Sequence, residues 1–234
     1  MSKYPTQYNQ ALGGWTFGPG VPAPRLPYRI GRIFFRMSLG TFWHLRIINR
    51  HYEPTSGSAL YISNHQSFLD PPLMSLALRR PMNYMARDSL FHNPLFRLMI
   101  SSVNAFPVKR STADTGALKE ALRRLKAGGQ LVLFPEGTRT TDGRVGEFLP
   151  GVAMLAQRAA DCVIPTVIEG AFESWPKTRP FPLPGRVLVM YAKPMPREQV
   201  QEMKGDELIA VVRGKIIQMQ AELRRIMGKP ELKY

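Results

Sequence analysis

From residue 58 onward, short apolar runs alternate with segments of helical periodicity, and this alternation restricts the possible folds more than any other feature of the chain. The predicted strands cover residues 59–63, 83–86, 103–108, 130–134, 163–169 and 186–192. The predicted helices cover residues 70–79, 90–101, 112–127, 151–160 and 205–227. Strands and helices that take turns are typical of a sheet covered on both faces. We therefore predict a single α/β domain with a mixed, mostly parallel β-sheet flanked by helices. A chain of 234 residues is long enough for one such domain.

The first candidate site follows the predicted strand at 59–63, in the sequence NHQSFLD. His65 and Asp70 are five positions apart, about 140° around a helix, so they must meet across a turn. We expect Asp70 to be the N-cap of the next helix, because a residue before proline avoids helical torsion angles. Its carboxylate would fix the tautomer of His65 and raise the basicity of the other ring nitrogen. His65 would then act as a general base, although a plain helix cap beside a loop histidine explains this motif equally well.

The second candidate site follows the strand at 130–134, in the sequence FPEGTR. Open α/β sheets bind ligands at the carboxyl ends of their strands. Gly137 allows the backbone to approach a ligand, Thr138 offers a hydroxyl group, and Arg139 offers a planar fork suited to phosphate. Glu136 is expected to organise the arginine or the loop, and an ordinary turn would also account for it.

The third candidate site is a loop at the end of the sequence NAFPVKR, which finishes with two cations, Lys109 and Arg110. Two cations after a strand can clamp a phosphate, but charges at that place are commonly just solvated. Three loops that offer a base with its orienting carboxylate and several cations together predict one active site.

The first 57 residues differ in composition from the rest. Residues 1–27 are rich in proline and glycine without an apolar signal sequence, which predicts an irregular leader. Residues 28–50 combine an apolar stripe with Arg29, Arg32 and Arg36, so they suit an amphipathic helix on an anionic membrane surface or one packed on its own domain. We assign 28–57 to this segment and a linker, and 58–234 to the folded domain. No run is apolar enough to span a bilayer.

The formal net charge of +15 favours a polyanionic partner, which leaves nucleic acid, an anionic membrane or a phosphorylated substrate. Nucleic acid is disfavoured, because the basic residues are dispersed and the aromatic residues lie in apolar stripes. The single cysteine, Cys162, lies in an apolar run and is expected to be a buried structural thiol.

Taken together, these motifs closely resemble the glycerolphosphate acyltransferase family, in particular its bacterial lysophosphatidate (1-acylglycerol-3-phosphate) acyltransferases. The resemblance spans about residues 58 to 195 and has four blocks in the family's order: NHQSFLD, NAFPVKR, FPEGTR and VIPTVI with Pro165. The first and third blocks at this spacing are specific.

The resemblance implies roles for individual residues. His65 would be the general base on the acceptor hydroxyl and Asp70 its partner, in a direct attack on an acyl thioester. A loop amide such as that of Gly137 would stabilise the oxyanion. The residues implied in binding the acceptor's glycerol phosphate are Arg110, Glu136, Gly137, Thr138 and Arg139. The donor would be acyl-CoA or acyl-carrier protein, with no metal or other cofactor, and the enzyme would be a peripheral or monotopic protein on the cytoplasmic face of the membrane.

Two departures concern phosphate binding. Leu149 stands where many members of the family have a lysine, and the second block has Pro107 and Lys109 where apolar and acidic residues are frequent. They leave the identity of the acceptor open, so another lysolipid remains an alternative, as does a membrane or lipid-binding homologue without activity. An intact His65 and Asp70 favour the enzyme.

Overall fold

The computed structural model describes residues 33, 37–102, 104–109 and 114–234. The leader expected at residues 1–27, most of the basic and apolar stripe expected between residues 28 and 36, and Arg110 lie outside them.

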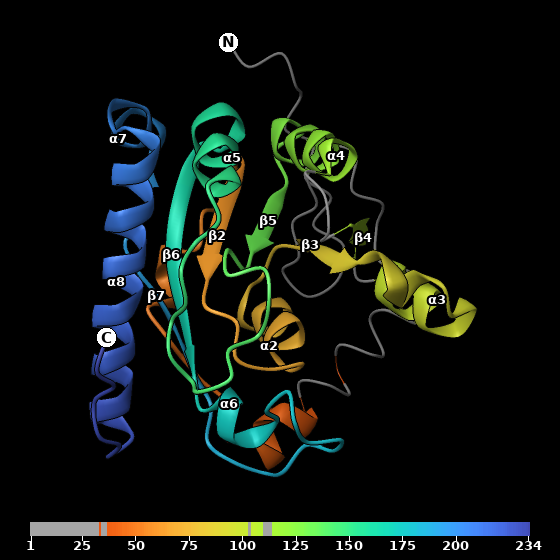
Figure 1. The fold of residues 1–234 in the computed structure, drawn as a ribbon, viewed down its shortest axis with the longest axis vertical. Coiled ribbons are helices and arrows are strands. Elements are labelled where there is room, and N and C mark those ends of the chain that lie inside the picture. The colour runs from red at the N-terminus through yellow and green to blue at the C-terminus, as the bar shows by residue number, and fades with distance from the viewer. Residues whose placement is uncertain (1–32, 34–36, 103, 110–113) are drawn as a thin grey trace.

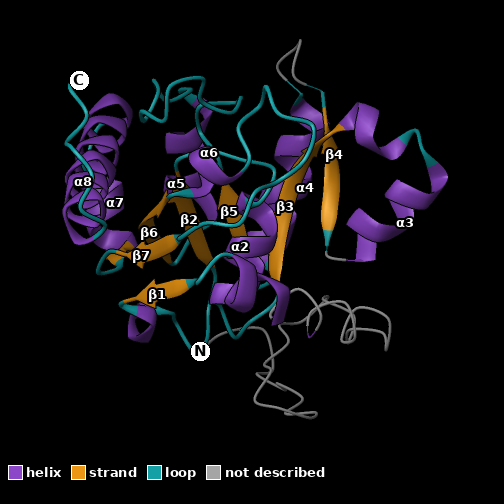
Figure 2. Ribbon diagram, turned by 90° about the horizontal axis from the view of Figure 1, so that it is seen from below, coloured by secondary structure: helices purple, strands orange, loops and turns teal. Residues whose placement is uncertain are grey.

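Within the described part of the chain, eight strands form one sheet in the order β1-β7-β6-β2-β5-β3-β4, with β8 paired to β6. The strands are β1 Arg46–Ile48, β2 Ala59–Ser63, β3 Met82–Arg87, β4 Ala105–Val108, β5 Gln130–Leu133, β6 Cys162–Glu169, β7 Leu188–Tyr191 and β8 Met195–Pro196. The paired strands are parallel, except that β7 and β8 run antiparallel to β6. Figure 2 shows them side by side across the molecule. The prediction of a mixed, mostly parallel sheet is confirmed.

Helices cover both faces of this sheet (Figure 1). They are α2 Asp70–Ala77, α3 Pro94–Ser102, α4 Thr115–Lys126, α5 Gly151–Ala159, α6 Ala171–Ser174, α7 Arg197–Glu202 and α8 Gly205–Ile226, with short 3-10 turns at Arg50–Tyr52 and Asp88–Phe91. The apolar residues of α2 belong to one core cluster, whereas those of α4, α5 and α8 belong to a second. The two clusters lie on opposite faces, as the alternation of strands and helices predicts.

Strand β2 shows why the apolar runs predicted the strands well. It lies between β5 and β6, and all five of its residues are buried. Leu60 and Ile62 pack in the cluster with α4, α5 and α8, while Ala59 and Tyr61 pack in the cluster with α2. Because both faces are covered, the strand reads as a continuous apolar run instead of an alternating one.

The segment at 28–50 differs from its prediction as one amphipathic helix. Residues 37–42 are helical, but Arg46–Ile48 form β1 at the edge of the sheet, parallel to β7. Ile47 and Ile48 are β-branched residues that favour strands, and they pack against opposite core clusters. The sheet therefore begins inside the segment that the sequence assigned to the membrane surface. Among the described residues, no helix combines the length and apolar composition needed to cross a bilayer.

Candidate active site

The first two predicted loops leave the same edge of the sheet. Strands β2 and β5 are parallel neighbours, with Ile62 paired to Leu133 near their carboxyl ends. The arrowheads of both strands point to the same end of the molecule in Figure 1. The loops that carry His65 and Glu136 therefore lie beside each other, at the position where open α/β sheets bind ligands.

His65 and Asp70 make the contact that the sequence predicts. Nδ1 of His65 lies 2.7 Å from Oδ2 of Asp70, whose side chain is fully buried, while 12% of the histidine side chain is exposed. The same carboxylate oxygen accepts the backbone N–H groups of Gln66 at 2.6 Å and Ser67 at 2.8 Å. Because Nδ1 faces the carboxylate, Nε2 is the ring nitrogen that can take a proton from a substrate hydroxyl.

The prediction that Asp70 is the N-cap of α2 is wrong. Leu69 is the N-cap, and Asp70 is the first residue of the helix. Its carboxylate turns back to the loop amides instead of binding the first amides of the helix, so it holds the loop in shape as well as orienting the imidazole. The ring of His65 also stacks on Phe134, with centroids 4.2 Å apart and planes inclined by 19°. Stacking on Phe134 therefore fixes the plane of the imidazole, and the contact with Asp70 fixes its rotation within that plane.

Glu136 joins the two loops. Its Oε1 accepts the backbone N–H of His65 at 3.0 Å, and the amide of Thr140 in the same loop donates to the carbonyl of His65 at 2.8 Å. Burial raises the pKa of Glu136 to about 7, against the lowering effect of hydrogen bonds from the His65 and Gly146 amides. The Glu136 loop therefore holds the backbone of the histidine from both sides, which is the organising role expected of this glutamate.

Gly137 has a φ of +68°, and a Cβ atom there would lie 3.0 Å from Cδ1 of Leu149. The tight turn thus requires glycine at this position. Its amide donates to the carbonyl of Phe134 at 3.1 Å. Because that amide closes the turn, the structure gives no support to the expectation that it stabilises an oxyanion.

Arg139 is placed on the His65 loop by an aromatic contact. Its guanidinium carbon lies 3.4 Å from the ring centroid of Phe68, three residues after His65. Thr138 precedes it on the exposed side of the turn. A planar cation and a hydroxyl therefore accompany the histidine at this edge of the sheet, as the sequence predicts for binding a phosphate.

The third predicted loop follows β4 at the edge of the sheet, where β5 and β3 lie between β4 and β2, and Lys109 is the one of its two cations that the structure describes. Lys109 is exposed, and its backbone N–H donates to Asp114 at 2.8 Å. Since Arg110 is outside the described residues, its role stays a prediction.

A buried ionic cluster under the His65 loop has no counterpart in the predicted site. Glu169, at the end of β6, is fully buried. Its carboxylate binds Arg224 at 2.7 Å, Gln220 at 2.9 Å, Lys229 at 3.1 Å and the side chain of Gln66 at 3.2 Å. The residue after His65 is therefore anchored to helix α8. The signal in the sequence was a lone glutamate at the end of the apolar run VIPTVIE.

Helix α8 and the segment after it also hold the loop that follows Glu136. Arg213 donates to the carbonyl of Gly146 at 2.8 Å, and Gln220 donates to that of Gly143 at 2.9 Å. The hydroxyl of Tyr234 accepts the amide of Val145 at 3.0 Å and contacts Gln220. Both loops of the candidate site thus rest on the same helix.

Cys162 at the start of β6 lies away from these loops. Its side chain is partly buried and not fully buried as the sequence predicts, yet burial raises the pKa of the thiol to about 11, which disfavours the reactive thiolate and suits a structural role.

Comparison with known proteins identifies the family of this chain. A family model described as Acyltransferase matches residues 44–169. A chloroplastic 1-acyl-sn-glycerol-3-phosphate acyltransferase of Arabidopsis thaliana is 30% identical over 81% of this chain and 54% of its own length. A protein of the same name from Streptococcus pneumoniae is 27% identical over 76% of this chain and 66% of its own. The chain spans about half the length of the chloroplastic relatives from Arabidopsis thaliana and Brassica napus.

The crystal structure of a 1-acyl-sn-glycerophosphate acyltransferase from Thermotoga maritima has a TM-score of 0.74 and 26% sequence identity, and the match covers 84% of this chain and 79% of that one. The two proteins therefore share a fold. Because the family model covers more than half of the chain and includes both the His65 and Glu136 loops, the protein belongs to the acyltransferase family.

Proposed function

We propose that the protein transfers a fatty acyl group from an acyl thioester, either acyl-CoA or acyl-carrier protein, to the free hydroxyl group of 1-acylglycerol-3-phosphate, giving phosphatidate for phospholipid synthesis. The observation that carries the proposal is the 2.7 Å contact between Nδ1 of His65 and the fully buried Asp70. A lipid-binding protein without activity has no use for an oriented base of this kind. The names of the similar proteins support the same reaction and acceptor.

His65 acts as the general base in a direct transfer. Nε2 takes the proton of the acceptor hydroxyl while its oxygen attacks the thioester carbonyl carbon, and the carbon–sulfur bond then breaks. The imidazolium returns the proton to the departing thiolate, so the products are an ester and a thiol. Asp70 stabilises the imidazolium and holds Nδ1 protonated throughout. The proposed reaction takes its base and its phosphate-binding cation from the chain and uses no metal or further cofactor.

Arg139 binds the phosphate of the acceptor in this proposal. Its planar guanidinium suits two phosphate oxygens, and its stacking on Phe68 orders it near the histidine. Thr138 and the turn at Gly137 complete this side of the site. Glu136 supports the site by accepting the backbone N–H of His65. Arg110 is the further cation that the family resemblance implies.

A second acceptor is favoured by one observation. Leu149, at the position where the family resemblance implies a lysine, lies beside Gly137 and exposes 56% of its surface. An apolar residue there removes one cation from the phosphate side of the site. A lysolipid with a different headgroup is therefore the alternative acceptor. With either acceptor, the protein works as a peripheral or monotopic enzyme at the cytoplasmic face of the membrane.

The test is a substrate panel. Purified protein is incubated with mixed micelles of lysophosphatidate and acyl-CoA, thiol release is followed, and the lipid product is identified by mass spectrometry. We expect thiol release that requires both substrates and yields phosphatidate. The panel is repeated with acyl-carrier protein and with other lysolipids, which identifies the donor and the acceptor. No thiol release with any donor and acceptor of the panel would contradict acyl transfer and favour a lipid-binding homologue without activity.

A further inference from the structure

Large apolar side chains are exposed beside the candidate active site. They come from three segments: the helix at 37–42, the His65 loop and the loop at 174–185. The exposed fractions are 52% for Phe42, 48% for Phe68, 75% for Phe181 and 51% for Leu183. We call these four residues the exposed apolar face. Single exposed apolar residues are ordinary, whereas a group of them marks an interaction site.

Hydrogen bonds hold the first and third segments together. The amide of Gly185 donates to the carbonyl of Phe42 at 3.0 Å, and the indole N–H of Trp43 donates to the carbonyl of Leu183 at 2.8 Å. Phe42 and Leu183 are therefore neighbours, although 141 positions of sequence separate them.

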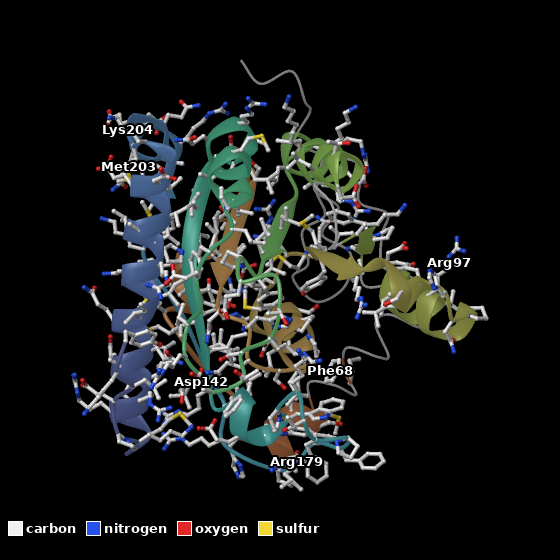
Figure 3. The ribbon with its side chains drawn as sticks, viewed as in Figure 1. Phe68, Arg97, Asp142, Arg179, Met203 and Lys204 are labelled. Carbon is white, nitrogen blue, oxygen red and sulfur yellow. The ribbon has the colours of Figure 1, made fainter. Side chains whose placement is uncertain are left out.

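Further contacts join the loop at 174–185 to the His65 loop. The ring of Trp175 lies 5.2 Å from that of Phe68, and the hydroxyl of Ser67 donates to the carbonyl of Trp175 at 2.9 Å. Phe68 is also the ring that carries Arg139. Figure 3 shows Phe68 and Arg179 toward the same end of the molecule, which is the end at which β2 and β5 finish in Figure 1. The exposed apolar face thus borders the proposed acceptor site.

The loop at 174–185 is built to keep its apolar side chains outside. It contains four prolines, and the indole N–H of Trp175 donates to the carbonyl of Arg179 at 3.0 Å. The amide of Leu183 donates to the carbonyl of Ser174 at 2.8 Å, which closes the loop at its base. A loop restrained in this way does not fold Phe181 back onto the core.

The charges around this loop indicate the partner. Residues 174–187 include Lys177, Arg179 and Arg186 but no aspartate or glutamate. Lys177 and Arg186 are exposed, and so is Arg46 on the neighbouring strand β1. Aromatic and aliphatic tips beside cations match a bilayer with anionic headgroups, in which the apolar groups enter the acyl boundary and the cations stay at the phosphates.

We propose that the exposed apolar face, with Phe181 and Leu183 at its outer part, docks the protein on the surface of an anionic lipid bilayer. The inference rests on the proposed function, since the acceptor of that reaction lies in the bilayer, and it extends membrane contact to residues far in sequence from 28–50. Docking through this face places the His65 and Arg139 loops at the lipid surface, so that a lysolipid headgroup reaches Arg139 without leaving the membrane.

The test compares two double variants of the full chain. Phe181→Ser with Leu183→Ser alters the outer part of the face and leaves His65, Asp70 and Arg139 untouched. The matched control, Leu98→Ser with Val211→Ser, alters residues on α3 and α8 that are 67% and 43% exposed. Binding is measured by co-sedimentation with phosphatidylcholine vesicles that do or do not contain phosphatidylglycerol. Thiol release is measured with short-chain substrates below their micelle concentrations.

We expect the first variant to bind the anionic vesicles about tenfold or more weakly, because each buried side chain of this size contributes at least that factor. The control should bind like the parent protein, and both should turn over the soluble substrates at the parent rate. Equal binding by parent and first variant, an equal loss in the control, or no vesicle binding by the parent would each overturn the docking proposal. Loss of binding without turnover by any of the proteins would support docking and contradict the acyl transfer.

A further variant guards against a loss of binding that reflects poor folding. Phe181→Trp preserves an aromatic side chain suited to the interface, so binding should be retained. Brominated lipids should quench its fluorescence more than that of the parent protein. Quenching equal to that of the parent would place residue 181 outside the bilayer and overturn the proposal.

Discussion

Two buried carboxylates flank the His65 loop, and they differ in their partners. Asp70 binds the imidazole of His65 and the loop amides of Gln66 and Ser67. Glu169 binds the side chain of Gln66 and the cations Arg224 and Lys229. An imidazole can gain and lose a proton near neutral pH, whereas a guanidinium and an ammonium group stay charged. We infer that Asp70 serves the chemistry while Glu169 serves the position of the loop, although both are equally buried.

The largest expected effect comes from Asp70→Asn. The amide cannot stabilise an imidazolium, and its NH₂ group favours the tautomer with the proton on Nε2, where a base is needed. We expect kcat to fall by about a thousandfold, within the range of general-base catalysis. Thermal unfolding followed by circular dichroism serves as the control for folding. A variant that keeps more than a tenth of the parent kcat would show that Asp70, like Glu169, serves only the position of the loop.

Glu169→Gln should show the reverse pattern. It leaves Arg224 and Lys229 without their buried counter-charge, so the free energy of unfolding should fall by roughly 3 kcal/mol. Urea denaturation measures this change. Because the glutamine can still bind Gln66, kcat of the folded protein should stay within a few-fold of the parent. A large loss of kcat at unchanged stability would assign Glu169 to the chemistry instead.

Glu136→Gln should change how the stability of the protein depends on pH. The pKa of Glu136 in the folded protein, about 7, lies above the 4.5 of a free glutamate side chain, so between these pH values the folded state binds more protons than the unfolded state. Stability should therefore fall as the pH rises from about 4.5 to 7, by about 2 kcal/mol after allowance for partial exposure. Unfolding free energies at several pH values should show this slope in the parent and a smaller one in Glu136→Gln. An equal slope in both proteins would show that Glu136 has an ordinary pKa.

The smallest expected effect is that of Arg139→Ala. Loss of one charged contact to phosphate should raise the KM for the acceptor about tenfold and leave kcat nearly unchanged. Arg139→Lys should recover only part of the loss, because an ammonium group lacks the planar fork and the stacking on Phe68. An unchanged acceptor KM in the alanine variant would show that the phosphate binds elsewhere.

Much of the fold, and the contact between Asp70 and His65, could be predicted from local sequence. Strand 59–63 was predicted with its observed bounds because both of its faces are buried, and Asp70 lies only five residues from His65, so a turn suffices to join them. Gln220, Arg224 and Lys229 lie 51 to 60 residues after Glu169 and Gln66 lies 103 residues before it, and no local periodicity predicts such contacts. The contact between Trp43 and Leu183 was hidden for the same reason. Strand β1 was missed because its three residues form a strand only by pairing with β7.

The proposed role of His65 as the base of an acyl transfer is tested by the kcat for thiol release by His65→Ala in mixed micelles of lysophosphatidate and acyl donor. Vesicle binding and the melting temperature, measured beside it, should match the parent protein. We expect kcat to fall at least about a hundredfold. A folded His65→Ala variant that keeps more than a tenth of the parent rate would contradict this role.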